Sequence, residues 1–487
     1  MKSRTNINPW FWVPTLYFAE GVPYFLVNNI SVMMFAKMGV PNDQLSFFTT
    51  LLYFPWFMKG IWSPIVDVVK TKRWWIVSMQ VLLTVLCVLL TLTLPTPDAA
   101  TIAAKGTSVG LFWLTLVLFI IAAFASATHD IAADGFYMLA HSPSSQAKFI
   151  GIRSTFYRVA SIFGQGVLVY IAGVVEKSSG DIPHSWKVTL AITAVVMFII
   201  TIYHLFALPK ADADRPRTSV AESTEGNEMQ SMGVKQSMKE LLSSFSTFFT
   251  KKGVWLAIIF MLLYRLPEGF LIKLCQPFLV DSVATTTNAA GQIIGGGLGL
   301  DTQVVGLLYG VIGVIFLLLG GILGGVFISR VGLKRSLWWM AACMTLPCFT
   351  FVYLSSFTEY LSTPEYIQWD SVITWLTEKG LSIEFLNVKN WIIGLAISIE
   401  QFGYGFGFTA YMMYMMYFSE GEFKTSHYAI CTAFMALSMM LPGFVAGKIE
   451  MAIGYQGFFW MVIGCCIATV IVTLFARRAV PEDYGKK

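Results

Sequence analysis

Two aspartates interrupt one of the most apolar stretches of the chain. The segment SATHDIAADGFY, residues 126–137, holds His129, Asp130 and Asp134 and follows a long run without a charged residue. Asp130 and Asp134 are four positions apart, so they share one face of a helix, about 40° apart. Carboxylates and an imidazole at such a place can bind a proton, pair with a base or contact a solute. The elements around them decide between these roles.

The composition of the chain is that of a membrane protein. Of 487 residues, 56% are hydrophobic and only 13% are charged, whereas soluble domains carry about a quarter charged residues. The Lys and Arg residues gather in short loops between apolar runs, which indicates membrane topology and argues against a nucleic-acid partner. Seven cysteines show neither a disulfide framework nor a metal spacing. We therefore predict a lipid-embedded chain without cofactor, metal or catalytic residues.

Twelve apolar stretches are long enough to cross a bilayer, which takes about 20 residues. The predicted spans are 9–36, 44–68, 74–95, 109–140, 148–175, 186–208, 253–280, 303–329, 336–357, 391–418, 424–450 and 455–477. Most basic residues of the connecting segments lie on the side that includes both termini. The positive-inside rule then predicts that both termini are cytoplasmic.

The longest polar break divides the chain into two related halves. We predict an N-terminal six-helix bundle over 1–208, a cytoplasmic linker with a possible amphipathic helix over 209–252, and a C-terminal six-helix bundle over 253–487. The halves share short motifs, with DVVKTKRWW after the second span and SRVGLKRSLWW after the eighth. Glu-Gly also occurs in the first and the seventh span. An all-α integral membrane protein with two pseudo-symmetric bundles of six helices resembles the layout of major facilitator transporters.

Apart from Asp67 and residues at the loop edges, five acids and five bases lie inside the predicted spans, so their charges cancel. The acids are candidates for proton coupling: Glu20, Asp130, Asp134, Glu268 and Glu400. The bases are Lys59, Arg153, Arg158, Arg265 and Lys273. A charge in hydrocarbon costs at least about 2.5–3.5 kcal/mol, so these side chains are expected to face a cavity or one another. They fall on spans one, two, four, five, seven and ten, which matches the cavity-lining helices expected of a facilitator fold.

The fourth and fifth spans are predicted to form two acid–base pairs. They run antiparallel from a short connection, which puts Asp130 at the height of Arg158 and Asp134 at the height of Arg153. Such pairs could hold the cytoplasmic ends of the helices together, bind the solute or carry the proton. The first of these roles, a gate, is favoured. Asp67 and Arg73, after the second span, are predicted to brace neighbouring helices and complete the set of gating residues.

Solute contacts are predicted mainly on the first, seventh and tenth spans. Pro267 invites a kink within YRLPEGFLIK, and the tenth span interleaves glycines with aromatic rings that could stack on a sugar or simply pack. The candidates are Tyr24, Lys59, Arg158, Tyr264, Arg265, Lys273, Tyr404 and Tyr411. His129 is expected to be a packing donor more often than a proton carrier.

The segment SATHDIAADGFY resembles the fourth-helix pattern S-A-T-x-D-I-x-x-D of the bacterial muropeptide permeases of the AmpG type and the related acetyl-coenzyme A transporters. EGVPYFL in the first span, KGIWSPIVD in the second and LYRLPEGF in the seventh also agree. The resemblance implies a secondary importer, proton-coupled in the muropeptide case, for a bulky solute that carries an N-acetylated sugar. The chain departs from these permeases at Tyr137, where they usually have Arg.

These observations predict a proton-coupled importer of a sugar-containing solute, such as GlcNAc-anhydroMurNAc, in the cell inner membrane. The alternatives are a proton- or sodium-coupled importer of oligosaccharides or disaccharides, a transporter of acetyl-coenzyme A or another anionic metabolite, and a non-transporting sensor. A membrane-embedded transferase would need a cluster of His and Asp or a nucleophile at the membrane surface. The sequence shows no such cluster, so an enzyme is not predicted.

Overall fold

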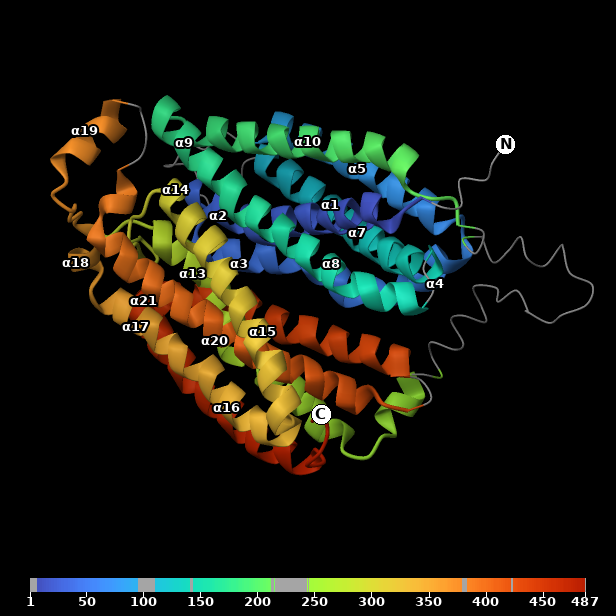
Figure 1. Cartoon of the computed structure of the whole chain (residues 1–487). Helices are drawn as coiled ribbons and strands as arrows, with labels where there is room; N and C mark the ends of the chain where they lie inside the picture. Colours follow the sequence, from blue (N-terminus) through green and yellow to red (C-terminus); the bar gives the residue numbers. More distant parts are fainter. Residues whose placement is uncertain are drawn as a thin grey trace, which may run out of the picture.

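Long helices from the two halves of the chain form two bundles that lie side by side (Figure 1). The computed structural model describes residues 7–94, 110–140, 143–211, 214, 243, 245–378, 383–421 and 424–486. The predicted linker therefore lies largely outside the described residues.

The N-terminal bundle contains six spans, some of which are assembled from consecutive helical pieces. They are η1 (Pro9–Phe11) and α1 (Val13–Phe25) with η2 (Leu26–Ile30) and α2 (Ser31–Lys37); α3 (Asn42–Leu51) with α4 (Phe54–Val68); α5 (Lys72–Thr93); α7 (Gly110–Ala140); α8 (Pro143–Ser161) with η3 (Ile162–Leu168) and α9 (Val169–Ser179); and α10 (Ile182–Ala207). The turn between the last two spans follows from its sequence. Gly180 adopts a left-handed φ of 66°, and the Asp181 side chain caps α10 by accepting a hydrogen bond from the backbone of His184.

The C-terminal bundle contains the other six spans. They are α12 (Val254–Leu263) with α13 (Leu266–Val280); α14 (Thr302–Val305) with η5 (Gly306–Gly313) and α15 (Val314–Val331); α16 (Leu333–Thr345) with η6 (Leu346–Cys348) and α17 (Phe349–Ser356); α20 (Val388–Ser419); and α21 (Lys424–Ala479). Gly454, with φ 71°, bends α21 between the predicted eleventh and twelfth spans. The strands β1 (Thr286–Thr287) and β2 (Ile293–Ile294) and the short helices α18 (Thr358–Ser362), α19 (Asp370–Glu378) and η7 (Glu384–Leu386) connect spans.

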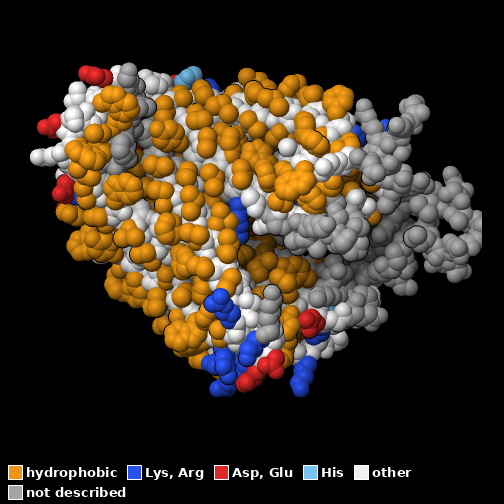
Figure 2. Space-filling view, in the orientation of Figure 1, with side chains coloured by type: hydrophobic (Ala, Val, Ile, Leu, Met, Phe, Trp, Pro, Cys, Tyr) orange, Lys and Arg blue, Asp and Glu red, His pale blue; other side chains and the backbone are white. Residues whose placement is uncertain are grey.

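The surface between the two ends of the bundles suits a lipid environment. Among the described residues, eight helical stretches are long and apolar enough to cross a membrane, and the longest, His427–Ala479, covers two predicted spans. Figure 2 shows hydrophobic side chains spread over both bundles on the face in view, with most charged side chains at its margins. The chain is thus built as a multi-pass membrane protein whose helical pieces assemble into the twelve predicted spans.

The two bundles repeat one packing arrangement. A Cβ atom on Gly21 of the first span would lie 2.6 Å from the Cβ of Ala160 in the fifth span. A Cβ on Gly269 of the seventh span would likewise lie 2.9 Å from Pro442 in the eleventh span. Both glycines follow a glutamate, and both allow close approach of the helix four spans later. This agreement supports the pseudo-symmetry predicted from the Glu-Gly repeat.

The bundles meet most tightly at one end, called here the distal end, which carries the α2–α3 and α9–α10 connections. They spread apart toward the opposite, terminal end, where the described chain begins (Figure 1). Glycines allow backbone contact between the bundles at the distal end, since a Cβ on Gly310 would lie 1.9 Å from Gln165 O and one on Gly447 would lie 1.8 Å from Asn42 O. Asn42 also donates a hydrogen bond of 2.9 Å to Glu450.

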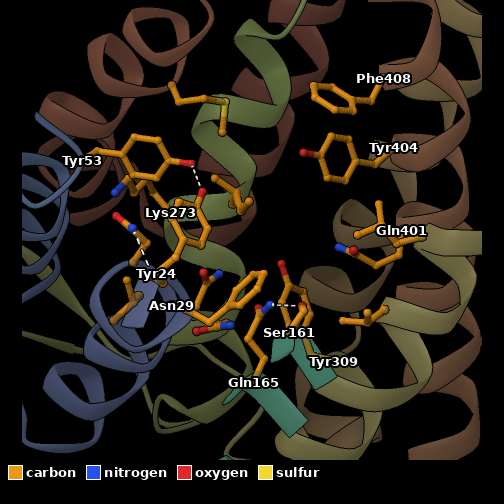
Figure 3. Close-up of a pocket in the computed structure, with 18 of the residues that line it drawn as sticks. Tyr24, Asn29, Tyr53, Ser161, Gln165, Lys273, Tyr309, Gln401, Tyr404 and Phe408 are labelled. Atoms are coloured by element: carbon orange, nitrogen blue, oxygen red, sulfur yellow. Dashed lines mark hydrogen bonds between the residues drawn. The ribbon is translucent and has the colours of Figure 1, made fainter. Parts of the chain in front are cut away.

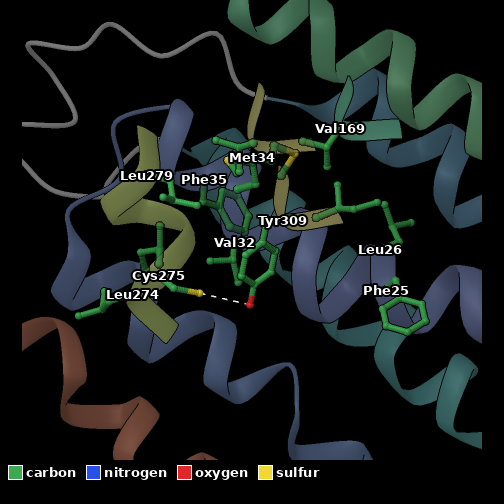
Figure 4. Packing of buried hydrophobic residues seen from close by; sticks show 14 of the residues in the cluster. Phe25, Leu26, Val32, Met34, Phe35, Val169, Leu274, Cys275, Leu279 and Tyr309 are labelled. Carbon is green, nitrogen blue, oxygen red and sulfur yellow. Dashed lines mark hydrogen bonds between the residues drawn. The ribbon is translucent and has the colours of Figure 1, made fainter. Parts of the chain in front are cut away.

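An apolar cluster reinforces this closure. Figure 4 shows side chains of α1, η2, α2 and α9 packed against side chains of α13 and η5 from the other bundle. Phe35 and Leu279 are both fully buried in it. Within the C-terminal bundle, Cys275 donates a hydrogen bond of 3.3 Å to the Tyr309 hydroxyl. The cavity described next is therefore closed on the distal side by packed side chains.

Candidate functional site

A cavity of about 370 Å³ lies between the bundles. Its polar lining includes Tyr24, Asn28, Asn29, Thr50, Tyr53, Ser154, Tyr157, Arg158, Ser161, Gln165, Arg265, Lys273, Gln276, Tyr309, Gln401 and Tyr404. These residues come from spans one, two, five, seven, eight and ten, and Figure 3 shows many of them converging on one space. Tyrosine rings and side-chain amides facing each other can bind the ring faces and hydroxyl groups of a sugar.

Several cavity residues were missed by the sequence analysis because they carry no charge. Asn28 and Asn29 lie on η2, Gln165 on η3 and Tyr309 on η5, and each of these segments is a π-helical turn within a longer span. Extra residues in a helical turn often occur at functional sites, since they redirect side chains and free carbonyl groups. An amide within an otherwise apolar span was the available signal in the sequence.

A second cavity of about 460 Å³ adjoins the first on its terminal side and contains a cluster of ionised groups. Lys59 Nζ lies 2.6 Å from Asp130 Oδ2. Arg153 Nη2 lies 2.6 Å from Asp134 Oδ1, and its guanidinium group lies 4.5 Å from the centre of the Tyr17 ring. This cluster joins spans two, four and five within the N-terminal bundle.

Glu20 makes the cluster acidic overall. Its side chain is only 6% exposed, it lies beside Asp130, and its Oε2 atom has no hydrogen-bond partner among the described residues. Three carboxylates, those of Glu20, Asp130 and Asp134, then face the two bases Lys59 and Arg153. A cluster with one excess carboxylate can take up one proton and become neutral.

One of the two predicted acid–base pairs is present and the other is not. Asp134 pairs with Arg153 as predicted, but Asp130 pairs with Lys59 instead of Arg158. Arg158 stands five positions after Arg153, so on a helix their side chains point in directions that differ by about 140°. Arg158 therefore faces the central cavity when Arg153 faces Asp134.

The C-terminal bundle holds a compact ion pair of its own. Arg265 donates to both carboxylate oxygens of Glu268, at 2.9 and 2.7 Å, and both side chains are 6% exposed. The same guanidinium group donates to the Tyr404 hydroxyl at 3.1 Å and lies 4.7 Å from the centre of the Phe408 ring. The break between α12 and α13 at Arg265 allows this geometry, because a new helix begins at Leu266 with Pro267 in its first turn.

Other predicted residues lie away from the cavity lining. Tyr264 and Tyr411 are fully buried, and they donate to the backbone carbonyls of Gly407 and Met261 at 3.1 and 2.8 Å. They therefore join α12 to α20 and are not among the residues that line the two cavities, so their contact with solute stays a prediction. Glu400 is also buried and accepts a hydrogen bond of 2.8 Å from Gln401.

The remaining candidates are accounted for within the N-terminal bundle. His129 is fully buried, with its Nε2 atom 2.9 Å from Gln80 Nε2, which agrees with a packing role. Arg73 donates to the carbonyls of Leu205 and Leu208 at the end of α10, at 2.6 and 3.2 Å. The side chain of Asp67 lies outside the described residues.

Comparison with known proteins places these features in a family. The model of the Major Facilitator Superfamily matches residues 15–372. A putative transporter AmpG 4 of Rickettsia conorii is 20% identical over 96% of this chain and 97% of its own length. The anhydromuropeptide permease of Escherichia coli K12 is 21% identical over 95% of this chain and 78% of its own length.

Solved structures agree on the fold. The chain matches a mutant form of the nucleoside transporter NupG with a TM-score of 0.64 at 12% identity, covering 96% of this chain and all of that one. It matches a D-xylose-proton symporter with a TM-score of 0.62 at 14% identity, covering 98% and 99%. The chain belongs to the major facilitator superfamily and is a multi-pass membrane transporter of a small-molecule solute.

Proposed function

We propose that this member of the major facilitator superfamily is a proton-driven importer of a sugar-containing solute such as anhydro-muropeptide. The solute binds in the central cavity between the bundles, and the proton binds in the acidic cluster beside it. The names of the sequence relatives support a muropeptide, since the permease of Escherichia coli K12 carries this substrate in its name. The rings and amides of the cavity suit a glycan.

The proposed setting is the cell inner membrane with both termini in the cytoplasm, as the distribution of basic residues favours. The distal end then faces outward, and this conformation is closed to the outside and open toward the cytoplasm. Alternating access would exchange this closure for one at the terminal end, where breaking and reforming the Arg153–Asp134 and Lys59–Asp130 pairs could act as a gate.

The proposal of proton coupling rests mainly on the extra carboxylate that Glu20 adds to the cluster. Glu20, Asp130 and Asp134 line the cavity next to the solute space, where Lys59 and Arg153 of the same bundle balance two of the three carboxylates. Arg265 also lines this cavity, but it is paired with Glu268. Protonation of the cluster neutralises it and lowers the cost of closing it off from water when the bundles change conformation. Tyr24, Tyr53 and Tyr157 line both the acidic cluster and the solute cavity. Binding of a proton in the cluster can therefore change the binding of solute in the cavity, and the reverse.

Uptake into proteoliposomes tests this function. Purified protein is reconstituted, and entry of labelled GlcNAc-anhydroMurNAc and of neutral disaccharides is followed with a proton gradient, with a sodium gradient and with neither. We expect accumulation only with the proton gradient, against protein-free vesicles as the control. Failure of every sugar to enter under all conditions would refute the proposal.

A further inference from the structure

We propose that the central cavity selects sugars that carry a carboxylate, with Lys273 and Arg158 as the two groups that bind it. The proposal rests on the proposed sugar-transport function and narrows its substrate class to sugar acids. It assigns the anion contact to two residues on opposite bundles, and not to Arg265 or Lys59.

The cations near the cavities fall into two groups. Lys59, Arg153 and Arg265 each lie within 2.7 Å of a carboxylate oxygen of the protein. Lys273 and Arg158 form no ion pair within the part of the chain that the structure describes, although both line the central cavity. Although the charges in the predicted spans cancel overall, the central cavity has an excess of positive charge from Lys273 and Arg158.

Lys273 occupies the C-terminal wall of the cavity. Its side chain is 6% exposed, and its ammonium group lies 6.0 Å from the centre of the Tyr53 ring of the other bundle. Figure 3 shows it beside Tyr53 and Tyr24. A Cβ on Gly443 would lie 2.9 Å from Lys273 Cε, so the glycine leaves room for the lysine stem. The side chain is held in place, but its charge lacks a counterion among the described residues.

Arg158 occupies the N-terminal wall. It projects from α8 toward the other bundle, where its Nη2 atom lies 3.9 Å from the place that a Cβ on Gly321 would take. A guanidinium group can bind both oxygens of a carboxylate at once. An anionic solute held between Arg158 and Lys273 would therefore touch both bundles.

An unpaired cation at this depth calls for an anion. Burial of a charge without a partner is costly, and a solute carboxylate would supply the partner that the described protein groups do not. The surrounding tyrosines and the amides of Asn29, Gln165 and Gln401 would bind the sugar ring. Neutral sugars satisfy the amides and rings but leave both cations unpaired, so the cavity should discriminate against them.

Thermal unfolding of the purified full chain in detergent tests the anion contact without transport. N-Acetylmuramic acid is compared with its amide, which lacks only the negative charge, and with N-acetylglucosamine, which has the same ring without the lactyl group. We expect the acid alone to raise Tm. Lys273→Gln and Arg158→Gln should each weaken its apparent affinity about tenfold or more, whereas Lys252→Gln, at an exposed lysine, should leave it unchanged.

Equal stabilisation by acid and amide, no stabilisation by the acid, or an unchanged affinity in both cavity variants would overturn the proposal. The unliganded protein gives a second readout. Lys273→Met should melt at a higher temperature than the parent because it removes an unpaired buried charge, and a lower Tm would show that the lysine has a structural partner. Uptake of neutral disaccharides into proteoliposomes without preference for the acid would refute this inference and leave the transport function intact. Failure of all sugars to enter would refute the function itself.

Discussion

Glu20 and Glu268 occupy equivalent places in the two bundles but have different surroundings. Each precedes a glycine at which another helix approaches closely, and each is about 95% buried. Three residues earlier, the N-terminal bundle has Tyr17 and the C-terminal bundle has Arg265. Arg265 binds both oxygens of Glu268, while Tyr17 donates instead to Asp134 at 3.2 Å. One oxygen of Glu20 is left without a partner among the described residues.

This difference suggests that the two halves of the repeat have different roles. Glu268 and Arg265 cancel each other's charge within the C-terminal bundle and hold neighbouring side chains in place. Glu20 instead adds a carboxylate to a cluster that already holds Asp130 and Asp134. The N-terminal bundle would then bind the proton, and the Arg265–Glu268 pair would shape the cavity wall against Tyr404.

The largest expected effect is on stability. Glu268→Gln leaves Arg265 buried and unpaired, so the free energy of unfolding should fall by about 3–5 kcal/mol. Glu20→Gln removes one of three neighbouring carboxylates and should leave stability unchanged or raise it. Thermal and denaturant unfolding of the two variants in the same detergent measures the contrast. Similar losses in both would mean that the two glutamates are equally paired.

Proton coupling should depend on Glu20 more than on Glu268, which is the reverse of the order expected for stability. Glu20→Gln is expected to lower proton-driven accumulation of the solute about 100-fold, equivalent to about 2.7 kcal/mol, while exchange of labelled for unlabelled solute persists. The double variant Arg265→Gln/Glu268→Gln keeps the acidic cluster and should still accumulate solute against the same gradient. Full accumulation by Glu20→Gln would remove Glu20 from the coupling mechanism.

Copying the C-terminal arrangement into the N-terminal bundle gives an intermediate effect. Tyr17→Arg places a guanidinium three residues before Glu20, as Arg265 stands before Glu268. We expect a roughly tenfold loss of coupled uptake, because the new cation balances the extra carboxylate that is proposed to take up the proton. Tyr17→Phe removes only the hydroxyl group and serves as the control. Equal losses in the two variants would point to the lost tyrosine and not to the added charge.

The smallest effect concerns the pairing of Asp130. A double-mutant cycle with Asp130→Asn and Lys59→Met should give a coupling of about 0.5–1 kcal/mol in unfolding free energy, since Lys59 is partly exposed. The same cycle with Arg158→Gln in place of Lys59→Met should give a coupling near zero. A reversal of these two results would restore the pair predicted from the sequence.

The sequence allowed the spans and the charged faces to be predicted, because apolar runs and isolated charges are local signals. It allowed the Asp134–Arg153 pair to be predicted from height along two antiparallel helices. The position of a residue along a helix axis does not fix the direction in which its side chain points around that axis. Arg158 was therefore assigned to Asp130, although the Arg158 side chain points toward the central cavity. Pairing of Lys59 with an acid on a neighbouring helix was possible from the sequence, but Asp130 could not be singled out, because the contact of α4 with α7 depends on the packing of the bundle.

The cavity itself was the least predictable part. Asn28 and Gln165 carry no charge, and the π-helical turns that hold them follow from packing between spans. Tyr264 and Tyr411 looked like ring-stacking residues but are used to join α12 and α20. Whether an aromatic side chain lines a cavity or fills a helix interface depends on contacts that one sequence does not display.

Solute-driven proton movement tests the central claim most directly. Proteoliposomes that contain the wild-type protein and an internal pH dye are placed without any pH gradient, and GlcNAc-anhydroMurNAc is added outside. The account predicts that the interior becomes acidic as the solute enters, and that Glu20→Gln abolishes this signal without abolishing solute exchange. Entry of the solute with no change of internal pH in the wild-type protein would contradict it.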